Sequence, residues 1–392
     1  MDTRLEREKT KSYLVLLILY ISLKPVYLFN SGGLQICDFV FILAVILEVI
    51  SSRGIIRFGR GNESFDKMMI LLVLYQIIIN SIWYIIVPDS RLLLSSAFYL
   101  YNLIAFFYIV AISRKYGVDT LKKSIVIGLL VSEIITIFGI IIYKGTSARN
   151  VGFFNNPNQL GLYGLLVITF LFFIRDYPQK IIRYIMVIMA VVAIVFSVSK
   201  AAILALTGFG LLYILFADRQ STMSSRIKKL LLLLVMGALV YIFLFSTSLN
   251  SYPLIRFIRL RILNMANEND SGLLTGRGYG RISEMGANIL WGMGEGAYFR
   301  FNIMNNNEVH SFIASIFVSY GIIGFLGYLL MHLYLIVDKG KTLYNLAGLS
   351  GIILYGITHN SIRNTLLWFI FAILYINKSR IGFGNGEADL LT

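Results

Sequence analysis

The chain of 392 residues has little charge, five prolines and one cysteine. Because Cys37 stands alone, an intramolecular disulfide is excluded, and any long loop must be held by packing and polar contacts. Charged residues make up 14% of the chain, against roughly 25% in typical soluble domains. This shortage of charge argues against an ordinary soluble protein.

Apolar residues are abundant instead, at 57% of the chain with a mean hydropathy of +0.76. Runs of roughly 17 to 25 apolar residues can cross the ~30 Å hydrocarbon layer of a membrane as helices. We count twelve such runs, which begin near Tyr13, Leu34, Lys67, Leu92, Leu121, Gln159, Ile181, Ala201, Lys229, Ser311, Thr342 and Arg363. The sequence therefore predicts an all-α polytopic membrane protein with about twelve transmembrane helices, in which residues 1–392 form a single integral membrane domain. Residues 197–200, which separate the seventh and eighth runs, are interpreted as a tight hairpin.

The positions of the basic residues predict the topology. Cytoplasmic loops of membrane proteins collect Lys and Arg, and with the N-terminus inside, the cytoplasmic segments hold 23 of the 35 basic residues. Both termini are therefore expected in the cytoplasm. The net charge of +15 reflects this topology, and nucleic acid is not an expected partner.

The other twelve basic residues are expected on the outer side, where orientation does not require them. They are Lys24, Arg91, Lys144, Arg149, Lys200, Arg256, Arg259, Arg261, Arg277, Arg281, Arg300 and Arg363. Apart from Lys24 and Lys200, nine of the remaining ten are arginines. The planar guanidinium group of arginine suits bidentate contact with phosphate. An anionic phosphate ligand on the outer face is the favoured interpretation, and a solvated loop surface is the alternative.

Residues 250–309 form the longest polar segment, which we predict to be a large outer loop between the ninth and tenth spans. Apolar residues alternate with arginines over Ile255–Leu263, which is typical of a helix in the membrane interface, where lipid headgroups would bind Arg256 and Arg259. The glycines of 292–296 lack the strand–helix context of a nucleotide-binding loop. Glu308 and His310 stand where the loop re-enters the membrane, and a histidine there suits proton transfer, although a lone histidine can also be structural.

Two shorter outer segments carry further candidates. Asn156, Pro157 and Asn158 are typical of the start of a helix, and a helix N-terminus beside Arg149 would also suit an anion. Lys200 follows Ser197-Val-Ser199, where it would either extend to the lipid headgroups or face the same anion.

These residues together resemble a family. His310-Ser311, nine residues and then Gly321-Ile-Ile-Gly324 is similar to the His-[Asn/Ser/Gln]-x9-Gly-x-x-Gly signature of bacterial O-antigen ligases. The segment from Arg149 to Asn158 resembles the family's loop before a central helix, and Ser197-Val-Ser199-Lys200 resembles its Ser-x-Ser-Arg turn, with Lys in place of Arg. The Gly-rich turn before His310 resembles the segment found before that histidine in the wider O-antigen ligase and polymerase superfamily. Four loose motifs in the right order therefore resemble this superfamily over most of the chain.

The resemblance implies a GT-C-like, metal-independent glycosyltransferase that needs no cofactor and uses an undecaprenyl-pyrophosphate-linked oligosaccharide. It implies an active site on the outer face of the bacterial cytoplasmic membrane, among membrane lipids, and it allows a chain-length regulator protein as a further partner. No Asp-X-Asp pair occurs, which agrees with a metal-free route. His310, assisted by Glu308, is expected to take the acceptor proton. Pyrophosphate is expected to bind Arg149, Arg277 and Arg281, with Lys200, Arg363 and Asn158 as further binding residues.

The resemblance does not separate polymerase from ligase, which differ in the acceptor. Lys200 in place of Arg, and the lack of an Asp in residues 359–363, favour an O-antigen or surface polysaccharide polymerase. The alternatives are a ligase that transfers polymer to lipid A-core, a flippase that binds the same lipid without chemistry, and a structural partner in an assembly complex. A flippase should bury polar groups near the membrane midplane, whereas Glu48, Gln76, Asn80 and Glu133 are scattered.

Overall fold

The computed structural model describes most of the chain, and all regular structure in the described part is helical. The described residues are 2–29, 33–51, 62–143, 149–174, 176, 179–217, 222–245, 255–256, 259–260, 263, 278–301 and 309–383. Of the predicted interfacial helix, only residues 255–256, 259–260 and 263 fall within this set, and each of them is helical.

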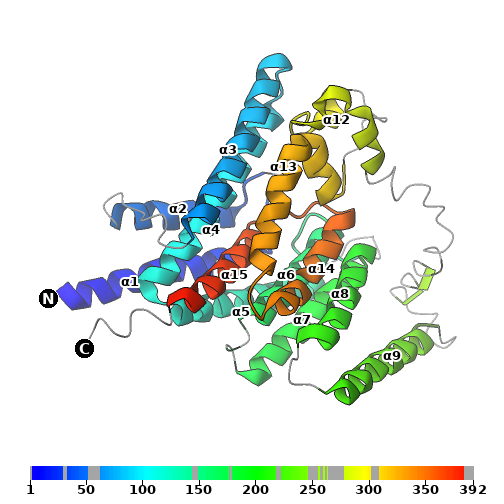
Figure 1. The fold of residues 1–392 in the computed structure, drawn as a ribbon. Coiled ribbons are helices and arrows are strands. Elements are labelled where there is room, and N and C mark those ends of the chain that lie inside the picture. Colours follow the sequence, from blue (N-terminus) through cyan, green and yellow to red (C-terminus); the bar gives the residue numbers. More distant parts are fainter. Residues whose placement is uncertain are drawn as a thin grey trace.

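Twelve long helices lie in the described part, and each overlaps one of the predicted apolar runs (Figure 1). They are α1 (Asp2–Leu23), α2 (Ile36–Ser51), α3 (Glu63–Ile86), α4 (Ser90–Tyr116), α5 (Val118–Ile142), α6 (Pro157–Phe173), α7 (Lys180–Ser197), α8 (Lys200–Leu212), α9 (Met223–Phe245), α13 (Phe312–Ile336), α14 (Thr342–Thr358) and α15 (Thr365–Phe383). A π-helical turn η1 (Tyr213–Ala217) follows α8. Before α13 come two 3-10 helices, η3 (Tyr279–Glu284) and η4 (Gly286–Ile289), and the short α12 (Ala297–Arg300).

Local sequence explains where several helices begin. Asn156 caps α6 by accepting a hydrogen bond from the backbone N–H of Asn158, with Pro157 at the first helical position, as expected from the sequence. Ser199 caps α8 and Ser311 caps α13, each through a side-chain oxygen that accepts a backbone N–H three residues later. The predicted break between the seventh and eighth runs is therefore confirmed at residues 198–199.

Helix α15 forms the centre of the bundle. Residues 366–372 are at most 2% exposed, and the helix packs against α4, α6 and α13. A helix that is apolar on all sides is expected to be buried on all sides. Around it, α1 packs against α5, α6 against α7, and α14 against α8, while α9 lies at the edge of the molecule (Figure 1).

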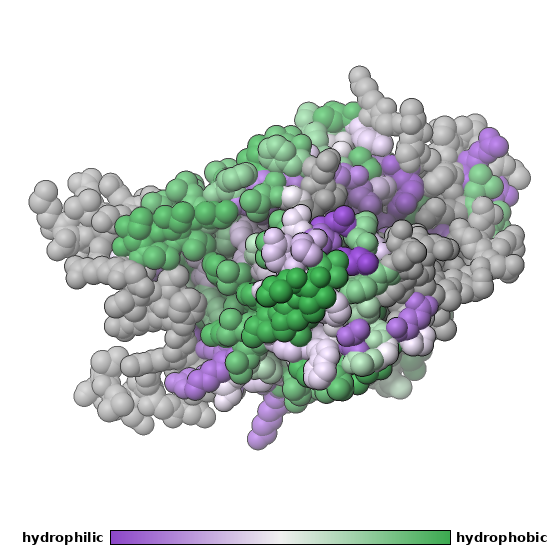
Figure 2. Space-filling view, turned by 90° about the horizontal axis from the view of Figure 1, so that it is seen from above, coloured by the Kyte–Doolittle hydropathy of each residue, from purple (hydrophilic) through white to green (hydrophobic). Residues whose placement is uncertain are grey.

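Five helices are long and apolar enough to cross a membrane, namely α3, α4, α5, α7 and α13. Large apolar side chains also remain exposed on them, such as Ile78 and Ile141, and apolar residues cover broad areas of the surface (Figure 2). An all-α membrane protein is the class that fits these observations. The helices α2, α6, α8 and α14 have 16, 17, 13 and 17 residues, so the twelve spans and the GT-C-like fold stay predictions.

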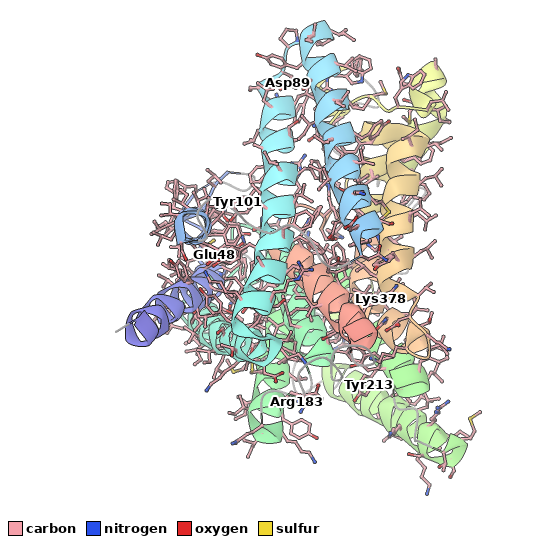
Figure 3. The ribbon with its side chains drawn as sticks, turned by 60° about the vertical axis from the view of Figure 1, so that its left-hand side comes forward. Glu48, Asp89, Tyr101, Arg183, Tyr213 and Lys378 are labelled. Carbon is pink, nitrogen blue, oxygen red and sulfur yellow. The ribbon has the colours of Figure 1, made fainter. Side chains whose placement is uncertain are left out.

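Two residues predicted on opposite sides of the membrane lie far apart in the molecule. Asp89, before α4, lies near one end, and Arg183, which was expected in a cytoplasmic segment, lies toward the other, while Lys378 lies nearer the middle (Figure 3). The positions of Asp89 and Arg183 agree with the predicted topology.

Helix α13 is broken at Gly321, and a glycine-rich turn of the large loop docks into the break. Gly321 has φ 64° and ψ −166°. Across the break, the N–H groups of Met293 and Gly294 donate to the Val318 and Ser319 carbonyls at 2.9 Å each, and the Ile323 N–H donates to Leu290 at 3.3 Å. The loop therefore replaces helical hydrogen bonds that α13 loses at the break.

Two aromatic side chains of α3 stabilise this junction by hydrogen bonds. The Tyr75 hydroxyl lies within hydrogen-bond distance of the carbonyl oxygens of Trp291 and Tyr320, at 3.1 and 3.0 Å. The Trp83 indole N–H donates to the Gly292 carbonyl at 3.1 Å. The first glycine of the Gly-x-x-Gly motif thus has a structural role, because a Cβ on Gly321 would lie 2.4 Å from the Leu290 oxygen.

We predict that Gly321→Ala lowers the free energy of unfolding by about 1–3 kcal/mol, because alanine would have to adopt backbone angles that are found almost only for glycine. The midpoint of thermal unfolding in detergent measures this effect. Gly210→Ala is the matched control, since a Cβ there meets nothing within 4 Å, and it should leave the midpoint unchanged or raise it. Equal midpoints for the two variants would contradict the docking described above.

Candidate functional site

Two polar cavities lie along one face of α4. The first, called here the Glu295 cavity, has a volume of about 400 Å³ and is lined by Arg91 and Ser95. The second, the Lys24 cavity, has a volume of about 360 Å³ and is lined by Phe98 and Tyr101 of the same helix. Residues four, seven and ten positions after Arg91 lie near one helix face, and ten residues of helix span about 15 Å.

The two cavities meet at the turn between α14 and α15. Gly33, Asn360 and Arg363 line both of them. Their walls come from helices α4, α6 and α13, and from the α1–α2 connection, the α14–α15 connection and the large loop, which were predicted to share one side of the membrane. The cavities therefore form one elongated site with Arg363 between its two halves.

Arg363 is held by a buried carboxylate. Its Nη2 donates to Glu295 Oε2 at 2.7 Å and to Ser95 Oγ at 3.1 Å. The Glu295 side chain is 5% exposed and the Arg363 side chain 39%. The carboxylate raises the pKa of the Arg363 guanidinium above its ordinary value, against the opposing effect of burial, so the side chain stays charged.

Glu295 is itself fixed by neighbouring helices. The Tyr99 hydroxyl donates to its Oε1 at 2.6 Å, and its backbone N–H donates to Asn80 Oδ1 at 3.1 Å. Asn80 also contacts the Tyr320 hydroxyl on α13, one residue before the break. The ion pair is thus built onto the junction between the glycine-rich turn and α13.

Two further arginines contact residues that line the Glu295 cavity. The Arg300 side chain is 3% exposed and donates to the carbonyl oxygens of Glu295 and Met293. Burial lowers its pKa, which its proximity to Asp89 partly offsets. Arg91 lies 3.5 Å from the centre of the Phe299 ring and 3.5 Å from Asp89. Arg300 therefore supports the loop, whereas Arg91 lines the cavity.

The Lys24 cavity contains a second ion pair. Lys24 Nζ lies 3.4 Å from Asp38 Oδ1, and their side chains are 11% and 8% exposed. Asp38 also accepts hydrogen bonds from the Tyr101 hydroxyl at 3.0 Å and from the Gln35 backbone N–H at 2.8 Å. Both halves of the site thus present a cation that is anchored by a carboxylate.

Arg149 and Asn158 form a separate cluster at the start of α6. Arg149 Nη2 donates to Asn158 Oδ1 at 2.8 Å, and its Nε donates to the Ser197 carbonyl at 3.2 Å. Lys200 is the first residue of α8, three positions after Ser197. The structure therefore brings the predicted 149–158 and 197–200 motifs together.

This Arg149 cluster adjoins the Lys24 cavity through Gln159, which lines that cavity. The Tyr355 hydroxyl donates to the Asn158 carbonyl at 3.0 Å, and its ring lies 4.9 Å from the His359 ring. His359 is thus a second histidine near the candidate site.

The predicted catalytic pair is described only in part. His310 is exposed and lies between Val309, which lines the Glu295 cavity, and Ser311, which caps α13. Glu308 and Arg277 lie outside the described residues, and of Arg281 only the backbone is described, within η3. Among the described residues, no group of three or more His, Cys, Asp and Glu side chains could hold a metal ion.

An apolar groove adjoins the polar site. It has a volume of about 230 Å³ and lies between α13, α14 and α15, where it is lined by Phe312, Leu329 and Leu367. Ser361 lines both this groove and the Lys24 cavity. An apolar groove, a cavity with anchored cations and a second polar cavity therefore follow one another in space.

No family model matches this chain, and no curated protein matches it. Its function must therefore be argued from the geometry of the site.

The prediction from sequence missed Glu295 and Lys24 as site residues. Glu295 stands between two glycines, Gly294 and Gly296, in a chain with only 20 acidic residues, and this was the available signal. Lys24 follows the first apolar run directly and precedes Pro25, where a headgroup contact is an equally good explanation of a lysine. Neither signal indicates that a carboxylate lies beside the cation.

We predict that Glu295→Gln lowers stability more than Tyr99→Phe, because it leaves Arg363 without its charged partner. The half-exposed guanidinium limits the cost to about 1–3 kcal/mol, against about 0.5–1.5 kcal/mol for one lost hydrogen bond. Adding Arg363→Gln to Glu295→Gln should restore part of the loss. A double-mutant cycle on thermal unfolding midpoints tests this, and additive effects would argue against the pairing.

Proposed function

We propose that the protein is a bacterial surface polysaccharide polymerase. It would transfer a glycan from undecaprenyl pyrophosphate onto a lipid-linked repeat unit at the outer face of the cytoplasmic membrane. The proposal rests on the resemblance of the motifs, on the apolar helices, and on the site built around Arg363.

The observation that carries most of this proposal is the order of the three spaces. A lipid-linked sugar consists of an apolar chain, an anionic phosphate group and a polar glycan. The apolar groove, the Lys24 cavity and the Glu295 cavity offer the corresponding surroundings in the same order, joined at Ser361 and Arg363. A soluble substrate would have no use for the apolar groove.

The chemistry requires a base and a stabilised leaving group. The acceptor hydroxyl oxygen forms a bond to the anomeric carbon of the donor sugar, and the bond from that carbon to the pyrophosphate oxygen breaks. His310 would take the hydroxyl proton, with Glu308 beside it in sequence. Arginine and lysine side chains would stabilise the charge that develops on the departing pyrophosphate.

The placement of the candidate phosphate-binding residues supports their assignment. Arg149 and Asn158 lie at the α6 end of the site, and Lys200 follows three residues after Ser197, whose carbonyl accepts a hydrogen bond from Arg149. Arg363 lies between the cavities. Arg277 and Arg281 remain proposals from sequence for the same role. Because α6 begins at Pro157 beside Arg149, the helix N-terminus adds a favourable field for an anion.

The buried polar residues of α3 favour this proposal over lipid transport without chemistry. Gln76 donates to the Tyr328 hydroxyl at 2.9 Å, and Asn80 binds the Glu295 backbone. Both therefore hold α13 and the glycine-rich turn in place, which is a structural use of polar groups. A ligase with lipid A-core as acceptor would use the same site and is separated by its product.

We predict that His310→Ala and Arg149→Gln abolish the ladder of polymer lengths in a deletion strain, whereas the wild-type gene restores it. Loss of a general base typically costs 10²- to 10⁴-fold in rate, which should leave single repeat units on the lipid carrier. Gel analysis of the surface glycan measures the ladder, and membrane levels of each variant are checked by immunoblot.

Lys67→Gln serves as the control, because Lys67 is 73% exposed and, within the described part of the chain, pairs only with Glu63 one turn earlier. Restored attachment of preformed polymer to lipid A-core by the wild-type gene would identify a ligase instead. Full ladders from both site variants would contradict the assignment of His310 and Arg149.

A further inference from the structure

We propose that the Lys24 cavity is a second anion site, which binds the phosphate or pyrophosphate group of the lipid-linked acceptor between Lys24 and Arg363. This inference rests on the proposed function. It adds Lys24, which no motif indicated, and it gives the Arg149 cluster and the Lys24 cavity separate ligands.

Two cations line the Lys24 cavity, and each retains hydrogen-bond donors. A lysine ammonium has three N–H donors, and Lys24 directs one of them to Asp38. Arginine has five, and Arg363 uses those of Nη2 for Glu295 and Ser95. Among the described residues no acceptor is found for the other donors. The Lys24 side chain is 11% exposed and the Arg363 side chain 39%, so these donors are available to water or to an anionic ligand.

The two carboxylates hold the cations in position and accept only some of their N–H donors. Asp38 accepts from the Gln35 N–H and the Tyr101 hydroxyl as well as from Lys24, and Glu295 accepts from Tyr99 as well as from Arg363. Each carboxylate is almost fully buried, at 8% and 5% exposure. The buried carboxylates therefore fix the positions of the cations before a ligand binds, as a preorganised anion site requires.

The surrounding helices favour an anion in the same place. Thr365 is the first residue of α15, Gln159 lies in the first turn of α6, and both line the cavity. The positive ends of two long helix dipoles therefore face this region. These helix dipoles add to the attraction that the two cations of the cavity exert on an anion.

The phosphate of a lipid carrier fits this cavity better than a free phosphate. Ser361 joins the cavity to the apolar groove, where a prenyl chain would lie, and Arg363 joins it to the Glu295 cavity, where a sugar would lie. A polymerase joins two lipid-linked molecules and must hold two anionic groups at once. The Arg149 cluster would hold the donor, and the Lys24 cavity the acceptor, which moves Arg363 from the donor pyrophosphate to the acceptor phosphate.

The test is binding of geranylgeranyl pyrophosphate to the purified full-length protein in detergent, with stoichiometry measured by native mass spectrometry. Wild type should bind two molecules. The double variant Lys24→Gln with Asp38→Asn removes the cation together with its buried partner. It should bind one molecule, because its affinity for the second molecule falls about 10- to 100-fold. Arg149→Gln should weaken the other site instead.

The control is the double variant Lys67→Gln with Glu63→Gln, which removes an exposed pair in the same way and should bind as wild type does. If the Lys24 variant does not fold, the double variant Glu295→Gln with Arg363→Gln replaces it, and it should likewise bind one molecule in place of two. Inorganic pyrophosphate and geranylgeraniol are tested alongside, and both should bind more weakly than geranylgeranyl pyrophosphate.

Unchanged affinity and stoichiometry in the Lys24 variant would overturn the inference, even if the wild-type gene forms glycan ladders. Equally tight binding of inorganic pyrophosphate would overturn the assignment to a lipid. Conversely, two lipid sites in a protein that forms no ladder would sustain the anion site and refute the polymerase.

Discussion

The docking of residues 290–296 into the break of α13 is the constraint on which the candidate site depends. It brings backbone within 2.4 Å of where a Gly321 Cβ would lie, and it fixes Gly294 against Ser319 by a hydrogen bond of 2.9 Å. Glu295 follows immediately, so its carboxylate reaches Tyr99 and Arg363 only while the turn is docked. Part of the large loop thereby packs against α13, where Met293 and Val318 share a small apolar cluster.

The helices were predictable from sequence because their signal is local. Twelve apolar runs match twelve helices, and Asn156, Ser199 and Ser311 mark starts that a cap rule identifies. The helix lengths were less predictable, since α8 ends after 13 residues and continues as a π turn. The break at Gly321 was not predicted either, because a glycine in an apolar run is also compatible with an unbroken helix.

The site was only partly predictable, because it is made by pairs of residues far apart in the chain. Arg149 and Asn158, nine residues apart, came from one motif and do contact each other. Glu295 and Arg363 are separated by 68 residues, and Asp38 becomes an anchor only because the start of α2 faces the end of α1. Composition could show that the outer arginines exceed what topology needs, but it could not name their acidic partners.

The pairing of cations with buried carboxylates follows from the apolar setting. A lone guanidinium or ammonium near a low-dielectric bundle would carry a large desolvation cost, which an adjacent carboxylate offsets. With Asp38 beside Lys24 and Glu295 beside Arg363, these four groups together carry no net charge. Each cation still keeps N–H donors for a ligand. The carboxylates therefore offset the desolvation cost of the cations and still leave donors that can bind an anion.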